Sequence, residues 1–340
     1  MKGCNSITVS SVSRWIFVAS IAIASPAGWA ATWHSLVSQE APDAGTQALA
    51  FLPNELWIHA GDSITWLFPQ AAEIHTVTFL RQNSSPQQVR PPRPGVPGGG
   101  CPGTTSDYSD FDGSACVSSA ELVGGATYTV NFPASGNFKF ICQVHPNMTG
   151  AVHVLDPSEP LPYNQLYYDH QAFLQASDLF ADGARLTQRA KTRSRQSLGN
   201  NVAAGIGEVV ANAGGSHTVT VSRFLRDPMV VSVGDTVEWT NFDPATPHTV
   251  TFGPPPAPPQ PPSAGVAVNS DGSRYAVLAS TTDSVHSGFL LAADQDRTGL
   301  PQSPLGVTRF QVTFTQPGTF RYACALHAPV GMVGQVIVRE

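Results

Sequence analysis

The chain has 340 residues, of which 12% are charged and 41% are hydrophobic, and it contains 30 glycines and 29 prolines. So many turn formers and so few charges exclude a coiled coil, a long-helix protein and a disordered polyelectrolyte, and they favour an all-β chain. The formal net charge of −6 argues against nucleic-acid binding, because neutralising phosphates requires an excess of basic side chains.

The first 30 residues have the pattern of a secretory signal peptide. Lys2 and Arg14 precede an apolar run at 15–24, and small residues follow as far as Ala30. The run is too short to cross a bilayer comfortably and ends as a cleavage site does. We therefore expect residues 1–30 to be removed and the mature protein to be periplasmic or secreted. No later stretch is apolar enough to predict an integral membrane segment in the mature chain.

The remainder of the chain contains two copies of one pattern. Residues 56–66 (LWIHAGDSITW) and 229–239 (MVVSVGDTVEW) both alternate, turn at Gly-Asp and end at Trp. The motif His-Thr-Val-Thr-Phe follows in both copies, ending at Phe79 and Phe252. Short alternating runs bounded by Gly, Pro, Asn and Asp are typical of a β-sandwich. We expect one domain at 31–156 and a second at 200–340.

Residues 157–199 differ in composition and predict a linker. A helix is expected at about 164–190, because Leu166, Phe173, Leu174 and Phe180 fall roughly on one face at helical spacing. A basic cluster lies at 185–195. It is either a solvated part of the linker or a docking patch for an acidic redox partner.

Histidine, cysteine and methionine recur at matching places in the two copies. They are His75, Cys142, His145 and Met148 in the first copy, and His248, Cys324, His327 and Met332 in the second. Two imidazoles, one thiolate and one thioether are the ligands of a blue-copper site. A single Cys-x2-His-x2-Met would often be coincidence, but two sets in register are not. The sequence therefore predicts two mononuclear type 1 copper sites per chain.

Both copies resemble the cupredoxins, the family of plastocyanin, amicyanin and pseudoazurin. Residues 322–332 (YACALHAPVGM) have the ligand-loop length of plastocyanin, and 140–148 (FICQVHPNM) have the shorter amicyanin type. The resemblance covers the chain except the signal and the linker. It implies two Greek-key β-sandwiches that carry electrons between redox partner proteins. It also implies that the downstream ligands His145 and His327 lie at the surface and pass the electron.

The residue after each upstream histidine is the second feature taken from the resemblance. In the family an Asn often follows this histidine and ties the two ligand loops together, whereas this chain has Thr76 and Thr249. Our hypothesis is that the threonine hydroxyls hold the ligand loops in the same way.

Two cysteines remain outside the ligand sets. Cys101 and Cys116 lie in the middle loop of the first copy and have no counterpart in the second. Spare thiols in an oxidising compartment tend to pair, so we expect a disulfide between them, with free reactive thiols as the alternative.

The residues around the ligands argue against an enzyme. Two-domain copper nitrite reductases and oxidases have a His directly before the blue-site Cys, where this chain has Ile141 and Ala323. Nitrite reductases place another His shortly after the upstream ligand, and Leu80 and Gly253 lie there. We therefore expect an electron carrier rather than an enzyme. A copper storage or delivery protein is one alternative, and an oxidoreductase completed by oligomerisation is another. The unequal ligand loops also predict two different reduction potentials.

Overall fold

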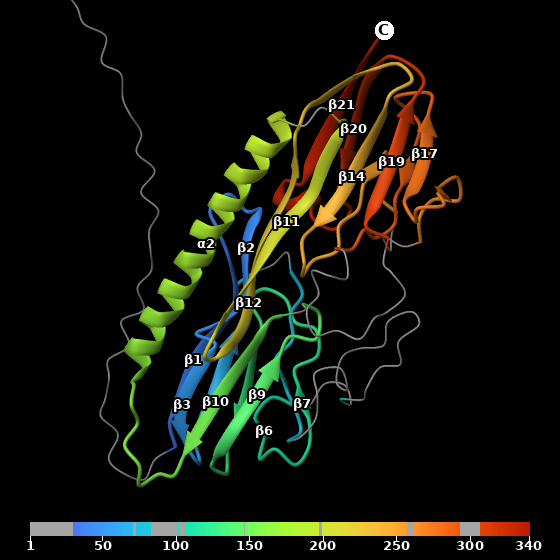
Figure 1. Cartoon of the computed structure of the whole chain (residues 1–340). Helices are drawn as coiled ribbons and strands as arrows, with labels where there is room; N and C mark the ends of the chain where they lie inside the picture. The colour runs from blue at the N-terminus through green and yellow to red at the C-terminus, as the bar shows by residue number, and fades with distance from the viewer. Residues whose placement is uncertain are drawn as a thin grey trace, which may run out of the picture.

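The described part of the chain forms two β-sandwiches and one long helix (Figure 1). The structure, a computed structural model, describes residues 30–70, 73–82, 101, 106–145, 147–196, 199–256, 261–292 and 307–340. The signal peptide expected at 1–30 lies outside the described residues except for Ala30. The predicted all-β fold of two sandwiches joined by a partly helical linker is confirmed.

Ten strands build the first sandwich. They are β1 (Thr32–Glu40), β2 (Thr46–Leu52), β3 (Glu55–His59), β4 (Ser63–Leu67), β5 (Thr78–Phe79), β6 (Ser109–Asp110), β7 (Val117–Ser118), β8 (Thr127–Asn131), β9 (Gly136–Ile141) and β10 (Thr149–Leu155). One layer has the order β2-β1-β4-β8-β6 and the other β3-β10-β9-β5-β7. β1 runs parallel to β4, and β3 runs parallel to β10.

The second sandwich repeats this plan. Its strands are β11 (Asn201–Asn212), β12 (Gly215–Leu225), β13 (Met229–Ser232), β14 (Thr236–Phe242), β15 (Thr251–Phe252), β16 (Ala267–Val268), β17 (Arg274–Leu278), β18 (Val285–His286), β19 (Arg309–Phe314), β20 (Gly318–Ala323) and β21 (Val333–Arg339). β11 runs parallel to β14, as β1 does to β4, and β13–β21 repeats the parallel pair β3–β10.

Alternating side chains from both layers fill each core. Trp66 is fully buried and its ring packs edge-on against Phe79 and Phe140. Trp239 makes the same kind of contact with Phe252 and Tyr322 in the second sandwich. Each aromatic cluster lies beside the cysteine that the sequence singles out, so the ligand strands are set in close-packed surroundings.

The two sandwiches share one sheet. β2 of the first pairs antiparallel with β12 of the second, with Leu49 opposite Thr218 and Thr46 opposite Val221. This pairing joins the facing layers into one 11-stranded sheet that runs through both domains. The backbone hydrogen bonds of this pairing therefore fix how the two domains lie relative to each other.

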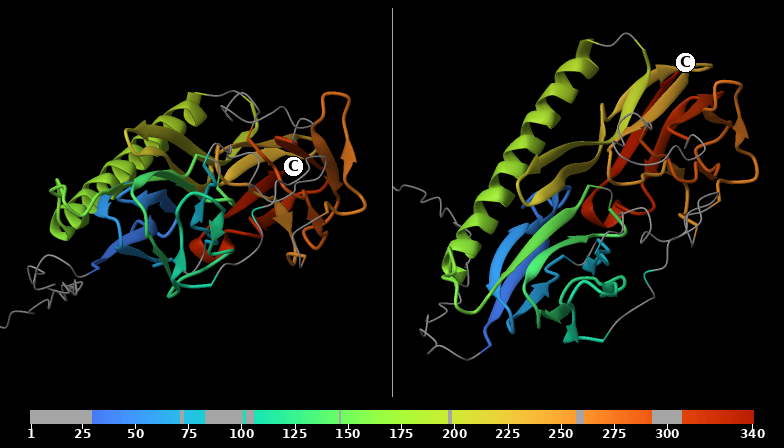
Figure 2. Two further views of the ribbon diagram at one scale, coloured as in Figure 1. Left: turned by 90° about the horizontal axis from the view of Figure 1, so that it is seen from below. Right: turned by 60° about the horizontal axis from the view of Figure 1, so that its bottom comes forward.

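The linker helix α2 (Gln165–Gln196) covers this junction (Figure 1 and Figure 2). Ala172, Ala176 and Leu179 of the helix are buried and pack on β2 and β12, and Tyr168 is buried in the core cluster of the first sandwich. A Cβ on Gly183 would come within 2.6 Å of Thr46 Cγ2, so the helix approaches the sheet closely there.

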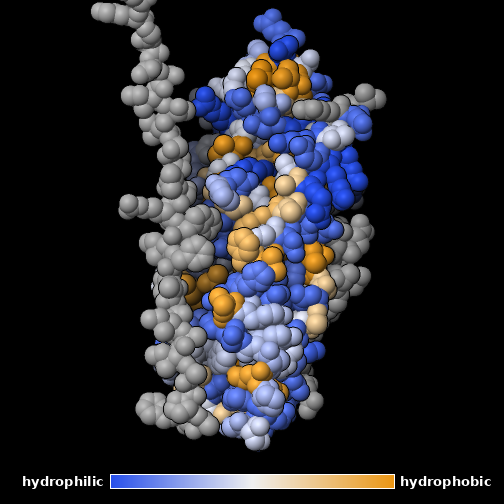
Figure 3. All heavy atoms as spheres, turned by 90° about the vertical axis from the view of Figure 1, so that its left-hand side faces the viewer, coloured by the Kyte–Doolittle hydropathy of each residue, from blue (hydrophilic) through white to orange (hydrophobic). Residues whose placement is uncertain are grey.

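The face expected for this helix is wrong in part. Leu166 and Phe173 are 75% and 63% exposed, because the helix turns its smaller residues toward the sheet at close range. Arg185, Arg189 and Lys191 of the basic cluster are exposed. On the face that forms the left-hand side of Figure 1, scattered apolar side chains lie among polar ones (Figure 3). In the part of the chain that the structure describes, no helix has the length and apolar character to cross a bilayer.

A disulfide links Cys101 to Cys116, as expected. It packs against Leu80 and Ile141 beside the first copper-ligand loop.

Candidate metal centres

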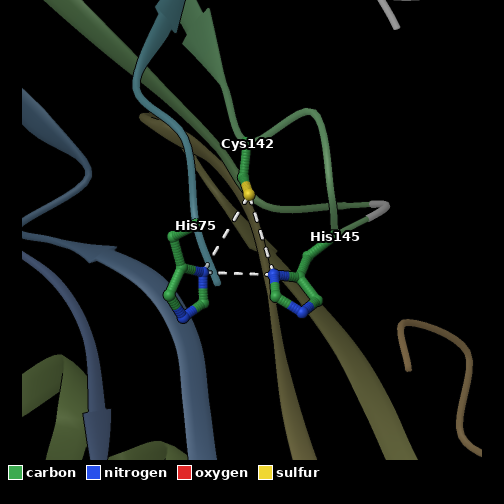
Figure 4. A group of neighbouring side chains, drawn as sticks. All are labelled: His75, Cys142 and His145. Carbon is green, nitrogen blue, oxygen red and sulfur yellow. Dashed lines mark hydrogen bonds between the residues drawn. The ribbon is translucent and has the colours of Figure 1, made fainter. Parts of the chain in front are cut away.

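Three donor atoms converge at the end of the first sandwich (Figure 4). His75 is held to Leu122 by two backbone hydrogen bonds, and Cys142 and His145 follow β9. Cys142 Sγ lies 3.9 Å from His75 Nδ1 and 3.6 Å from His145 Nδ1. The two Nδ1 atoms are 3.1 Å apart. All three side chains are buried.

The second sandwich holds an equivalent group. Cys324 Sγ lies 4.0 Å from His248 Nδ1 and 3.3 Å from His327 Nδ1, and the two imidazole nitrogens are 3.1 Å apart. The longer ligand loop forms a short 3-10 helix at Ala328–Val330 before it reaches Met332.

Both ligand loops close in the same way despite their different lengths. The Cys142 amide donates to Met148 O at 2.9 Å, and the Cys324 amide donates to Met332 O at 3.0 Å. Met148 and Met332 are fully buried in the same clusters as the two cysteines. The structure therefore brings the two histidines and the cysteine of each predicted set together, and it places Met148 and Met332 in the same loops.

The donor set fits copper. Bonds of about 2.0 Å to nitrogen and 2.3 Å to sulfur, the lengths that zinc makes, would set three donors in a trigonal plane roughly 3.5–3.8 Å apart. Burial alone would raise the pKa of the Cys142 and Cys324 thiols. The adjacent imidazoles outweigh burial and hold each thiol pKa well below its usual range. A thiolate with two imidazoles and a thioether nearby favours copper over hard cations.

Each threonine after the upstream histidine contacts the cysteine loop. Thr76 Oγ1 accepts a hydrogen bond from the Gln143 amide at 2.8 Å, and the Thr76 amide lies 3.4 Å from Cys142 Sγ. Thr249 makes the same two contacts, with the Ala325 amide at 2.7 Å and with Cys324 Sγ at 3.4 Å. These contacts are those that our hypothesis requires, and their effect on the metal remains a prediction.

The downstream histidines are not at the surface, and that expectation is wrong. His145 and His327 are only 2% and 3% exposed. They face each other across the domain junction, because the β2–β12 pairing sets the ligand-loop end of one sandwich against the other.

One carboxylate lies between these histidines. Glu73 Oε1 is 2.9 Å from His327 Nε2, and Glu73 Oε2 is 3.6 Å from His145 Nε2. Burial would raise the pKa of Glu73, but the two imidazoles outweigh it and lower the pKa far below its usual range. Sequence reasoning missed Glu73. The sequence feature that could have indicated it is a carboxylate two residues before the ligand His75, because the second copy has the neutral Thr246 at the equivalent position.

The upstream histidines differ in their surroundings. His248 Nε2 lies 3.2 Å from Asp243 Oδ2, which also accepts a hydrogen bond from the Thr220 hydroxyl. Burial would lower the pKa of His248, but Asp243 and Cys324 together outweigh it and raise that pKa. Gly205, with φ of +83°, leaves the room that this ring needs, because a Cβ there would lie 2.1 Å from His248 Nε2.

In the first copy the position of Asp243 is taken by Gln70, whose Oε1 accepts a hydrogen bond from Ser38. Among the described residues His75 Nε2 has no hydrogen-bond partner. Burial accordingly lowers the pKa of His75.

Comparison with known proteins places this chain among two-domain cupredoxins. The profile of the family "Copper binding proteins, plastocyanin/azurin family" matches residues 39–155 and 210–339, well over half of the chain. The chain therefore belongs to the plastocyanin/azurin family of copper-binding proteins.

Several solved structures are similar to parts of the chain. Oxidised plastocyanin from Dryopteris crassirhizoma is 21% identical, with 41% of this chain and 99% of that chain covered and a TM-score of 0.21. A reduced amicyanin variant is 18% identical, with 42% and 82% covered and a TM-score of 0.22. A blue copper oxidase from Nitrosomonas europaea is 13% identical, with 91% and 86% covered and a TM-score of 0.24.

Proposed function

We propose that this protein is an exported carrier of single electrons with two type 1 copper ions. The observation that carries the proposal is the pair of buried His-Cys-His groups, each with a methionine in the same loop. His75, Cys142, His145 and Met148 would hold one ion, and His248, Cys324, His327 and Met332 the other. Bound copper would supply the one-electron couple.

The chain's own residues keep each site rigid. Hydrogen bonds from the cysteine amides to the methionine carbonyls close the two ligand loops. Thr76 and Thr249 tie the strand of the upstream histidine to the cysteine loop. A site that is held in one geometry needs little rearrangement when an electron arrives or leaves. Burial of the thiolates also excludes water from the sulfur.

The residues beside the ligands support a carrier rather than an enzyme. Ile141 and Ala323 precede the two cysteines and offer no imidazole that could lead to a further copper. Each predicted ligand set is complete within one domain, so no ligand position is left for a substrate.

Export is supported by the apolar run at 15–24 and by the disulfide, which suits an oxidising compartment. Mass spectrometry of protein recovered from the periplasm or medium should find a chain that begins near Ala31. A chain that keeps residues 1–30 and stays in the cytoplasm would contradict export.

The test of the carrier function is repeated redox cycling of copper-loaded protein in the presence of a copper chelator. A carrier should be reduced and reoxidised many times while its copper content stays constant. Transfer of copper to the chelator during cycling would indicate a delivery protein instead. Consumption of nitrite, or of oxygen with a phenol, would indicate an oxidoreductase.

A further inference from the structure

Glu73 is shared by the two candidate copper sites. It belongs to the first sandwich and lies two residues before the ligand His75, yet its carboxylate reaches His327 of the second sandwich. Its Oε1 is 2.9 Å from His327 Nε2, and its Oε2 is 3.6 Å from His145 Nε2. The Glu73 residue is 8% exposed, so the contact is largely shielded from solvent.

The chemistry of a metal-bound imidazole gives this contact a direction. In both sites the Nδ1 atoms face the cysteine sulfur, so Nδ1 is the ligand atom. A neutral imidazole that binds through Nδ1 keeps its proton on Nε2 and can only donate there. The Nε2–H group of His327 therefore donates to Glu73 Oε1, and the Nε2–H group of His145 lies 3.6 Å from Glu73 Oε2 in a longer polar contact.

We propose that Glu73 is the bridge through which the two copper sites exchange electrons. The proposal rests on the carrier function above. The route is imidazole, carboxylate, imidazole, with a hydrogen bond of 2.9 Å between Glu73 and His327 and a longer polar contact of 3.6 Å between Glu73 and His145.

The exchange is balanced within the chain. The reduced site gives up one electron and is oxidised, and the other site takes up that electron and is reduced. No covalent bond forms or breaks, and both Nε2 protons remain in place. Glu73 is a positioning residue here, because it acts through the ligand imidazoles and does not bind the metal.

The test uses Glu73→Gln with Glu55→Gln as the matched control. Glu55 Oε1 lies 3.0 Å from His153 Nε2, so it forms a comparable pair with a histidine outside both sites. A glutamine can accept from one imidazole, but its amide N–H₂ faces the N–H of the other, so at least one contact is lost.

The measurement is the first-order exchange between sites after a substoichiometric pulse of reductant. Absorption and EPR spectra of Cys142→Ser and Cys324→Ser serve as references for each site. We expect Glu73→Gln to slow this exchange by about 10-fold or more while keeping both coppers, and Glu55→Gln to leave the rate unchanged. An unchanged rate in fully loaded Glu73→Gln, or equal slowing in Glu55→Gln, would overturn the bridge.

A second measurement needs no variant. In the reduced, copper(I)-loaded wild-type protein, the Nε2–H protons of His145 and His327 should give NMR signals that exchange slowly with solvent. Fast exchange of either proton would overturn the shielded contacts of both imidazoles with Glu73. A wild-type protein that fails to bind copper would instead refute the carrier function, so the two failures are distinguishable.

Discussion

Asp243 is the residue that most clearly distinguishes the two sites. Its carboxylate lies against His248, while the neutral Gln70 has the equivalent place in the first copy. A negative charge beside a ligand stabilises the more highly charged, oxidised metal. The second site should therefore have the lower reduction potential, and the unequal methionine loops add to the difference. Electrons would then pass preferentially from the second site to the first.

Replacement of Asp243 by Asn tests this assignment. A charge-assisted hydrogen bond exceeds a neutral one by about 1 kcal/mol, which corresponds to roughly 40 mV for a one-electron couple. Asp243→Asn should raise the potential of the second site by about that amount in an anaerobic redox titration. Asp271→Asn, an exposed carboxylate of the same domain, is the control and should change neither potential. One Nernstian wave for both wild-type sites, or no shift in Asp243→Asn, would refute the argument.

Thr76 acts on the first site through the cysteine loop. Thr76→Val removes the hydrogen bond that Thr76 Oγ1 accepts from the partly buried Gln143 amide, which costs about 0.5–1.5 kcal/mol of stability. We expect weaker copper binding and a shifted visible spectrum. The control is Thr65→Val, because the Thr65 hydroxyl forms a hydrogen bond with the Thr129 hydroxyl within the sheet, away from the metal site. It should cost about 1 kcal/mol or less and leave the spectrum unchanged. Identical spectra of Thr76→Val and wild type would show that the hydroxyl does not hold the ligand loop.

At the scale of elements, α2 stabilises the junction through a few buried side chains. Leu179 is fully buried against β2 and β12, whereas Leu166 on the same helix is exposed. Leu179→Ala should lower the free energy of unfolding by about 2–5 kcal/mol. Leu166→Ala should change it by less than about 0.5 kcal/mol. Urea unfolding of both variants measures this, and equal losses would mean that the helix does not pack as described.

The helix also shows where sequence reasoning stops. The large residues at helical spacing suggested a buried face that is wrong for Leu166 and Phe173 but not for Phe180, since hydrophobic periodicity takes no account of how close two elements come. Ala172, Ala176 and Gly183 permit a close approach, but their size becomes informative only when the opposing sheet is known. The strands were more predictable, because their alternation and repeated motifs are local properties of the sequence.

At the scale of the whole molecule, the shared sheet determines how the sites face each other. From the repeat we predicted two sandwiches and the two groups of histidine and cysteine donors that the structure brings together. The repeat could not predict the β2–β12 pairing, because contacts between residues about 170 positions apart leave no local signal. The burial of His145 and His327 and the position of Glu73 both follow from that pairing, so the sequence could not reveal them.

Metal should stabilise both domains. Copper present at 100 times its dissociation constant adds about 2.7 kcal/mol to the stability of a site that binds only when folded. Removal of copper with a chelator should therefore lower the unfolding temperature. Cys142→Ser and Cys324→Ser should each lose the copper-dependent stabilisation that comes from one of the two sites. An unfolding temperature that does not respond to copper would mean that the metal is not bound by the folded sites.

The most direct test of two type 1 copper sites is the copper content per chain measured together with the visible spectrum. We predict two equivalents of copper and an intense blue colour in the oxidised protein, with one equivalent left in each single cysteine variant. A protein that retains zinc in either site, or binds copper without the blue absorption, would contradict the account.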